Sequence, residues 1–245
     1  MDMSFALLCC FAFLSYFSAA FAGFGGVIIV LTLGAHLYPI KWMLPVLLPL
    51  TVIANLYIFI RHHKYIDAPV LLRRILPFMG TGLVIGFALF NLLHGELLRT
   101  LFGLIVILVA MRELINLIRS SHQNEAPLPG WISTGYVFVA GVIHGIYASG
   151  GPLLVYAVNK MQLQKSVFRS TLSSVWLIIN IFLTGSYAVG GKIDLESLKY
   201  SAYLLPPLTL GVLLGEFLHQ LIPERSFKIF VFMLLILSGV FITLK

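Results

Sequence analysis

Long blocks of apolar residues, separated by short polar segments, dominate the chain. The runs lie near residues 4–35, 43–60, 75–93, 97–118, 131–159, 167–188, 198–220 and 226–244. The hydrocarbon core of a bilayer is about 30 Å thick and takes about 20 helical residues to cross. Six of the runs fit one crossing each, so the pattern predicts an all-α, polytopic integral membrane protein.

The two longer runs, 4–35 and 131–159, each contain a glycine cluster: Gly23-Phe24-Gly25-Gly26 and Ser149-Gly150-Gly151-Pro152. If all eight runs cross once, the loops on the two sides hold 9 and 7 Lys+Arg. If the two glycine-containing runs enter and return on the same side, the loops hold 11 and 5. The second arrangement fits the excess of basic residues in cytoplasmic loops and puts both termini outside. We therefore favour the re-entrant arrangement over eight simple spans.

The sequence also repeats weakly at an offset of 125–129 residues. The matches are Gly25-Gly26 with Gly150-Gly151, Asn55 with Asn180, Ile66-Asp67 with Ile193-Asp194, Gly82 with Gly211, and Gly86 with Gly215. We predict two inverted repeats at 1–118 and 131–245, joined by a linker loop at 119–130. Each repeat would hold one broken or re-entrant helix and three transmembrane helices. The paired glycines would let neighbouring helices approach closely.

The composition supports a membrane environment. Of the 245 residues, 60% are hydrophobic and 10% are charged, whereas soluble domains carry about 25% charged residues. The formal charge of +7 indicates orientation and contact with lipid headgroups rather than a nucleic-acid partner. The adjacent Cys9 and Cys10 offer neither metal-ligand spacing nor a disulfide framework, and we predict no cofactor and no metal.

The glycine clusters are the first candidates for a binding site. Broken backbone inside a bilayer is tolerated where protein or a water-filled cavity satisfies it. Half-helices that begin at the clusters would point free N–H groups and positive helix ends at an anion. The candidate substrate-binding residues here are Gly23, Phe24, Gly25, Gly26, Ser149, Gly150, Gly151 and Pro152. The alternative is that these glycines only allow close helix packing.

Three further polar residues in apolar spans are candidates. Asn55 and Asn180 occupy matched positions and could donate to an anion's oxygens, or could hydrogen-bond between helices. His144 lies about two turns before the second cluster and could couple transport to protons. The alternative for His144 is a hydrogen-bonded packing role.

Motifs of catalysis are absent from the sequence. It contains no GxSxG, HExxH, CxxC or nucleotide-binding GxxxxGK[ST] pattern. We therefore predict that the protein is not an enzyme. Any transport would be driven by a gradient or by a partner.

The pattern Ala22-Gly23-Phe24-Gly25-Gly26 and its echo at residues 148–155 resemble the TauE/SafE family of sulfite and organosulfonate exporters. The segment Gly191-Lys192-Ile193-Asp194 is also similar, and the likeness runs from about 15 to 244. Val27 departs from the family pattern, because the second half has Pro152 there. The resemblance implies a multi-pass inner-membrane protein that exports small oxidised-sulfur anions.

The leading hypothesis is a secondary transporter, acting by alternating access, for a small anion such as sulfite or a sulfonate. An anion channel, a permease for another small anion, and a membrane anchor without flux of its own remain open alternatives. Membrane lipids are expected partners, and the exposed apolar faces would serve lipid or a second copy in a homodimer.

Overall fold

In a computed structural model of the protein, most of the described residues belong to helices. The structure describes residues 3–22, 26–93, 95–119, 129–161 and 163–218, together with 229, 232, 233, 235–237, 239, 240 and 243. No strand occurs among these residues. The predicted all-α class is confirmed.

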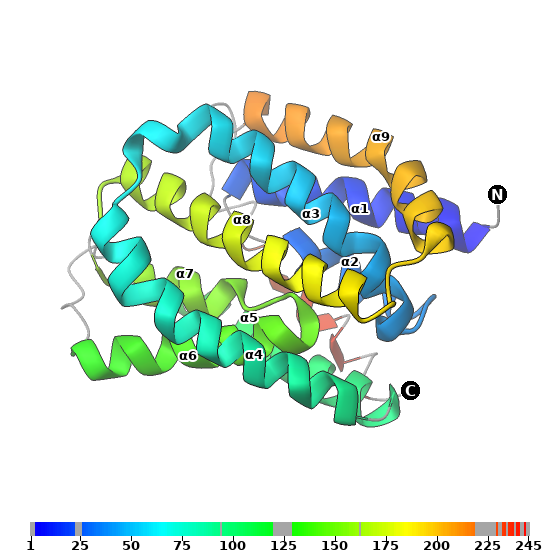
Figure 1. The fold of residues 1–245 in the computed structure, drawn as a ribbon, viewed down its shortest axis with the longest axis horizontal. Helices are drawn as coiled ribbons and strands as arrows, with labels where there is room; N and C mark the ends of the chain where they lie inside the picture. Colours follow the sequence, from blue (N-terminus) through cyan, green and yellow to red (C-terminus); the bar gives the residue numbers. More distant parts are fainter. Residues whose placement is uncertain are drawn as a thin grey trace. The chain divides into compact units, whose positions relative to one another are not determined.

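Two similar series of helices follow one another along the chain (Figure 1). The first series is α1 (Met3–Ala22), α2 (Gly26–Gly34), α3 (Ile40–His62), η1 (His63–Tyr65), η2 (Val70–Ile75), α4 (Leu76–Leu92) and α5 (Gly95–Arg119). The second is α6 (Gly130–Tyr147), α7 (Gly151–Asn159), α8 (Lys165–Val189) and α9 (Leu195–Leu218). In both series a long helix precedes a short one of nine residues, α2 or α7.

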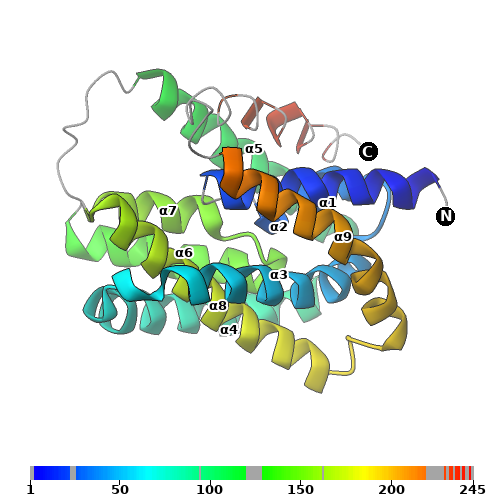
Figure 2. The same ribbon diagram turned by 90° about the horizontal axis from the view of Figure 1, so that it is seen from above.

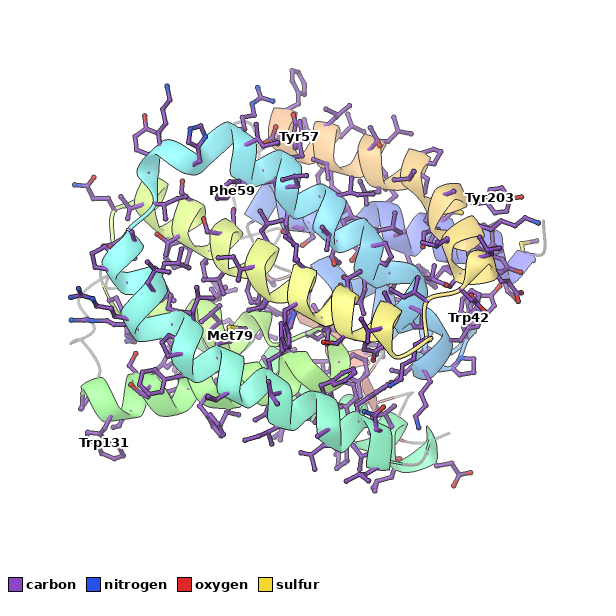
Figure 3. The ribbon with its side chains drawn as sticks, in the orientation of Figure 1. Trp42, Tyr57, Phe59, Met79, Trp131 and Tyr203 are labelled. Atoms are coloured by element: carbon purple, nitrogen blue, oxygen red, sulfur yellow. The ribbon has the colours of Figure 1, made fainter. Side chains whose placement is uncertain are left out.

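Six helical segments in the described part of the chain are long and apolar enough to cross a membrane. They are Met3–Phe21, Ile40–Arg61, Val70–Leu92, Glu96–Arg119, Ser170–Val189 and Leu195–Leu218. The predicted multi-pass membrane protein is therefore confirmed. Trp131, at the start of α6, is 78% exposed and points away from the helix (Figure 3), as in the aromatic belts of membrane proteins. The predicted run at 226–244 and the linker at 119–130 lie largely outside the described residues.

The chain forms two compact units. Unit 1 contains Met1–Leu44, Leu93–Asn124 and Ala202–Lys245, and unit 2 contains Pro45–Leu92 and Glu125–Ser201. Each unit therefore combines segments from both predicted repeats. The boundaries of the repeats in the sequence stay a prediction.

In unit 2, α4 of the first series packs against α6 of the second. A β-carbon added at Gly82 would collide with the Phe138 carbonyl, and one added at Gly86 with the Val142 carbonyl. Gly141 on α6 meets the backbone of Met79 in the same way (Met79 is labelled in Figure 3). Only residues without a side chain allow two helix backbones to come this close.

Unit 1 contains the matching contact between α1 and α9, which lie side by side in Figures 1 and 2. A β-carbon added at Gly211 would lie 2.6 Å from the Phe13 carbonyl oxygen, and one at Gly215 would lie 2.6 Å from that of Phe17. Phe13 is separated from Phe138 by 125 residues, which is the offset of the sequence repeat. The same contact therefore occurs twice, each time between helices from opposite halves. The predicted close packing at the paired glycines is confirmed.

Aspartates cap the helices that carry these glycines. The Asp67 carboxylate accepts a hydrogen bond from the Val70 amide at 3.0 Å, and the Asp194 carboxylate accepts one from the Ser197 amide at 2.8 Å. The Ser197 hydroxyl in return accepts the Asp194 amide hydrogen at 2.9 Å. A carboxylate that receives a helix's free amides keeps its charged form. These bonds from Ser197 hold the pKa of Asp194 below its ordinary value of 3.8.

The helices of unit 2 show how the second glycine-containing run turns. Helices α4 and α6 are parallel, because Gly82 meets Phe138 while the later Gly86 meets Val142. Helices α4 and α8 are also parallel: the Asp67 amide donates to the Thr171 hydroxyl at 3.0 Å near their starts. Near their ends, Lys192, which follows α8, donates to Asn91 of α4. Figure 1 shows the three helices running in one direction.

Because α6 and α8 run in the same direction, the chain must return between them, and α7 makes that return. The Tyr136 ring on α6 lies 5.1 Å from the Tyr156 ring on α7, and Gly150 lies against Ala140. Positions progressively later on α7 therefore meet positions earlier on α6. The re-entrant arrangement predicts this course, whereas eight single passes would make α6 and α8 antiparallel.

Helix α2 doubles back along α1 in unit 1. A β-carbon at Gly26 would lie 3.8 Å from that of Ala19, and one at Gly34 would lie 3.2 Å from the Leu8 side chain. Between them, the Val30 amide donates to the Ser15 hydroxyl at 3.3 Å. Both short helices are thus the second arms of helical hairpins. The inverted orientation of the two halves stays a prediction.

Candidate functional site

The second helix break is formed by four residues that leave the helical conformation or restart it. Helix α6 ends at Tyr147, and Ala148 adopts the left-handed conformation with φ 51° while its amide donates to the His144 carbonyl at 2.7 Å. A left-handed residue is a common end of a helix. Helix α7 starts at Gly151 with Pro152 in its first turn, where a missing N–H is tolerated. The predicted interruption at 149–152 is therefore present.

The start of α7 offers backbone amides. The first amides of an α-helix have no partner within the helix, and they carry the positive end of its dipole. Leu154 donates to the Gly150 carbonyl at 3.3 Å and begins the hydrogen-bonded turns. The hydroxyl of Ser149, one of the candidate substrate-binding residues, donates to the Tyr147 carbonyl at 2.9 Å. In this structure its oxygen can only accept a further bond.

Gly150 and Gly151 have different steric surroundings. A β-carbon at Gly150 would collide with the Ala140 carbonyl oxygen and would lie 3.0 Å from the β-carbon of His144. At Gly151 the nearest atom would be a Trp176 ring carbon at 3.9 Å, an ordinary contact. Gly150 is therefore required for the close approach of the break to α6. Gly151 instead leaves the first turn of α7 open towards the Trp176 ring.

His144 and Asn180 are the predicted site residues that the structure joins directly. The Nε2 atom of His144 lies 3.0 Å from Oδ1 of Asn180, and the residues are 2% and 3% exposed. The imidazole stacks on the Trp176 ring, with centroids 5.5 Å apart and an angle of 27°. The interhelical hydrogen bond that we set as the alternative for both residues is therefore present.

The second nitrogen of this imidazole is the unusual feature of the site. Within the described part of the chain, Nδ1 of His144 is buried and has no hydrogen-bond partner. An amide oxygen only accepts, so Nε2 carries the hydrogen towards Asn180, and in a neutral ring Nδ1 keeps its lone pair. Buried polar atoms nearly always have partners, and an exception points to a bound water, ion or ligand, or to a functional role.

The first-half candidates are placed as follows. Gly23, Phe24 and Gly25 lie outside the described residues, and Gly26 opens α2 in unit 1. Asn55 is half-buried on α3, and no hydrogen bond in the described part of the chain links it to His144 or Asn180. By the repeat offset, the first half has Ala19 and Thr51 at the positions of His144 and Trp176.

Sequence reasoning missed Trp176. An aromatic residue in an apolar span looks like any other core residue, so composition gave no reason to choose it. Its spacing was the available signal: Trp176 lies four residues before Asn180, which puts both on one face of α8.

Comparison of the sequence with known proteins shows the family. The sequence matches the sulfite exporter TauE/SafE family over residues 8–242. The chain belongs to this family. It is also 28% identical over 171 residues to the "Probable inner membrane transporter protein TsaS" of Comamonas testosteroni, which covers 69% of this chain and 70% of that protein. No solved structure matches the chain.

Membership of the TauE/SafE family and the transmembrane helices together establish a multi-pass inner-membrane transport protein. The family resemblance inferred from the glycine clusters is confirmed.

Proposed function

We propose that this TauE/SafE protein carries small sulfur-containing anions, sulfite or organosulfonates, across the inner membrane by alternating access. The family name supports the substrate class. The direction is export in this proposal, and the substrate binds at the second helix break, between α6 and α7 of unit 2.

The observation that carries the proposal is the buried His144–Asn180 pair beside the second helix break. The break supplies backbone amides and a positive helix end without a buried Lys or Arg. The β-carbon of His144 lies beside Gly150, so the histidine, with its unpartnered Nδ1, adds a titratable side chain next to the break. Sulfite and sulfonates are compact, with three oxygens that accept hydrogen bonds, and they match the backbone amides of the break together with an imidazole that donates once Nδ1 is protonated.

Alternating access is supported by the division into two compact units. Rocking of one bundle against another is the usual mechanism of transporters with internal repeats. Here each unit has its own internal seam of close helix packing, at Gly82 and Gly86 in unit 2 and at Gly211 and Gly215 in unit 1. Such seams keep each unit rigid while the units move as bodies.

Transport by purified protein in proteoliposomes tests the proposal. We expect saturable uptake of radiolabelled sulfite or sulfoacetate, stimulated by unlabelled anion inside the vesicles. Acetate should not compete. Binding is measured in parallel as a thermal shift with sulfite, taurine, sulfoacetate, sulfate and acetate. Conductance that does not saturate with anion concentration would show that the protein is a channel and not a carrier. Absence of both binding and flux for every sulfur anion would refute the proposal.

A further inference from the structure

Among the titratable side chains on the helices packed around His144, only the imidazole of His144 is of a type that gains or loses a proton near neutral pH. The elements packed against α6 are α4, α7 and η2, and α8 reaches it through Trp176 and Asn180. Helix α4 has no ionisable side chain. The others contribute Tyr136 and Tyr147 on α6, Tyr156 on α7, Tyr187, Lys165 and Arg169 on α8, and Arg73 and Arg74 on η2. Tyrosine, lysine and arginine keep their protonation states near pH 7.

Charge balance decides what the free Nδ1 can do. An imidazolium without an anion would be an unpaired charge inside a membrane-spanning bundle, and so would an anion facing a neutral imidazole. When both are present, the Nδ1–H of the imidazolium donates to an anion oxygen and the positive ring offsets one negative charge of the anion. The Asn180 oxygen already accepts the Nε2 hydrogen, so the ring keeps its orientation when Nδ1 takes up a proton.

We propose that His144 takes up one proton at Nδ1 together with each anion, so that the protein moves an anion and a proton as a pair. This rests on the proposed anion transport and names its coupling. The proton comes from bulk solution, bonds to the Nδ1 lone pair and leaves when the anion leaves. The first half has Ala19 at the matched position, so the unit of coupling is a single proton.

The test measures protons bound on anion binding. Isothermal titration of the purified protein with sulfoacetate, in two buffers of different ionisation enthalpy, gives the number of protons taken up. We compare the wild type with His144→Gln, because the glutamine amide can still donate to Asn180 but cannot titrate. The difference between the two proteins cancels any proton that the anion itself exchanges. We expect about one proton for the wild type and none for the variant.

His63→Gln is the matched control. His63 is an exposed histidine on η1 in the same unit, and its removal should leave the proton number of the wild type unchanged. A second measurement, on the wild type alone, does not depend on whether the variant folds. The affinity for sulfoacetate should fall about tenfold for each unit of pH above the point where free His144 titrates.

The outcomes separate the two proposals. Anion binding with the same proton number in the wild type and His144→Gln, or with an affinity independent of pH, overturns the coupling and leaves anion transport standing. Failure of the wild type to bind sulfoacetate or sulfite overturns the proposed function and the coupling with it.

Discussion

Gly150 approaches the Ala140 carbonyl so closely that a β-carbon at position 150 would overlap the oxygen. Positions 140 and 150 lie on the two arms of the α6–α7 hairpin. We expect Gly150→Ala to push the arms apart, lowering stability by about 1–3 kcal/mol and abolishing transport, because overpacking against backbone cannot be relieved by a rotamer change.

Thermal unfolding in detergent and uptake of sulfite measure the two effects of Gly150→Ala. Gly135→Ala is the control on α6, because a β-carbon there would meet nothing within 4 Å. Wild-type uptake by Gly150→Ala would show that the hairpin is not part of the transport path.

Two substitutions at Gly151 distinguish the effect of adding any side chain from the effect of adding a large one. The β-carbon of Gly151→Ala would make only an ordinary contact with Trp176, so this variant should fold and keep most of its transport. Gly151→Leu would add three carbons beyond a β-carbon that already contacts that ring, and uptake should be abolished while membrane insertion persists. Proteoliposome flux and the amount of protein in the membrane fraction distinguish the effects, and normal flux from Gly151→Leu would remove the break from the site.

The seam between α4 and α6 gives a prediction for stability. Gly86→Ala would collide with the backbone of Val142, and we expect a loss of about 1–3 kcal/mol. Gly80, on the same helix, has nothing within 4 Å of its β-carbon position, so Gly80→Ala should change stability by no more than about 1 kcal/mol, in the favourable direction. Equal melting temperatures for the two variants would contradict the close approach.

Asp194 makes stability depend on pH in acid. Its pKa is lower in the folded protein because the Ser197 amide and hydroxyl bond to residue 194, so the carboxylate stabilises the fold above its ordinary pKa of 3.8. This contribution is lost as the pH falls through the folded-state value. Asp194→Asn keeps a good capping residue but cannot titrate, and should flatten this part of the pH profile, whereas Asp194→Ala lowers the melting temperature at pH 7. Melting temperatures between pH 7 and pH 3 test this, and an unchanged profile in Asp194→Asn would contradict it.

Local features of the fold were readable from the sequence because they depend on local chemistry. The break at 149–152 follows from a glycine pair before a proline, and the repeat match of Asp67 with Asp194 joins two residues that the structure places at helix starts. The glycine pairs predicted close packing, but their partners could not be predicted. Helical periodicity shows which face of a helix carries small residues, but it does not show which distant helix packs against that face.

The site could be predicted as a set of candidates and not as an arrangement. His144 and Asn180 stood out because polar groups are costly in apolar spans. Their contact joins residues 36 positions apart, which only the hairpin course of α6 and α7 brings about. The left-handed Ala148 was unpredictable for a different reason: glycine is the usual residue in that conformation, and alanine at this position gives no warning.

The exchange of helices between the two series has a consequence for biosynthesis. Helix α4 leaves the ribosome well before α6, and α1 precedes its partner α9 by almost the whole length of the chain. Until the later helices α6 and α9 are synthesised, the surfaces of α1 and α4 that will pack in these seams must therefore contact lipid or the insertion machinery. The nascent protein can thus complete neither unit from its first half alone, and release of a truncated chain would leave both seams open to wrong partners.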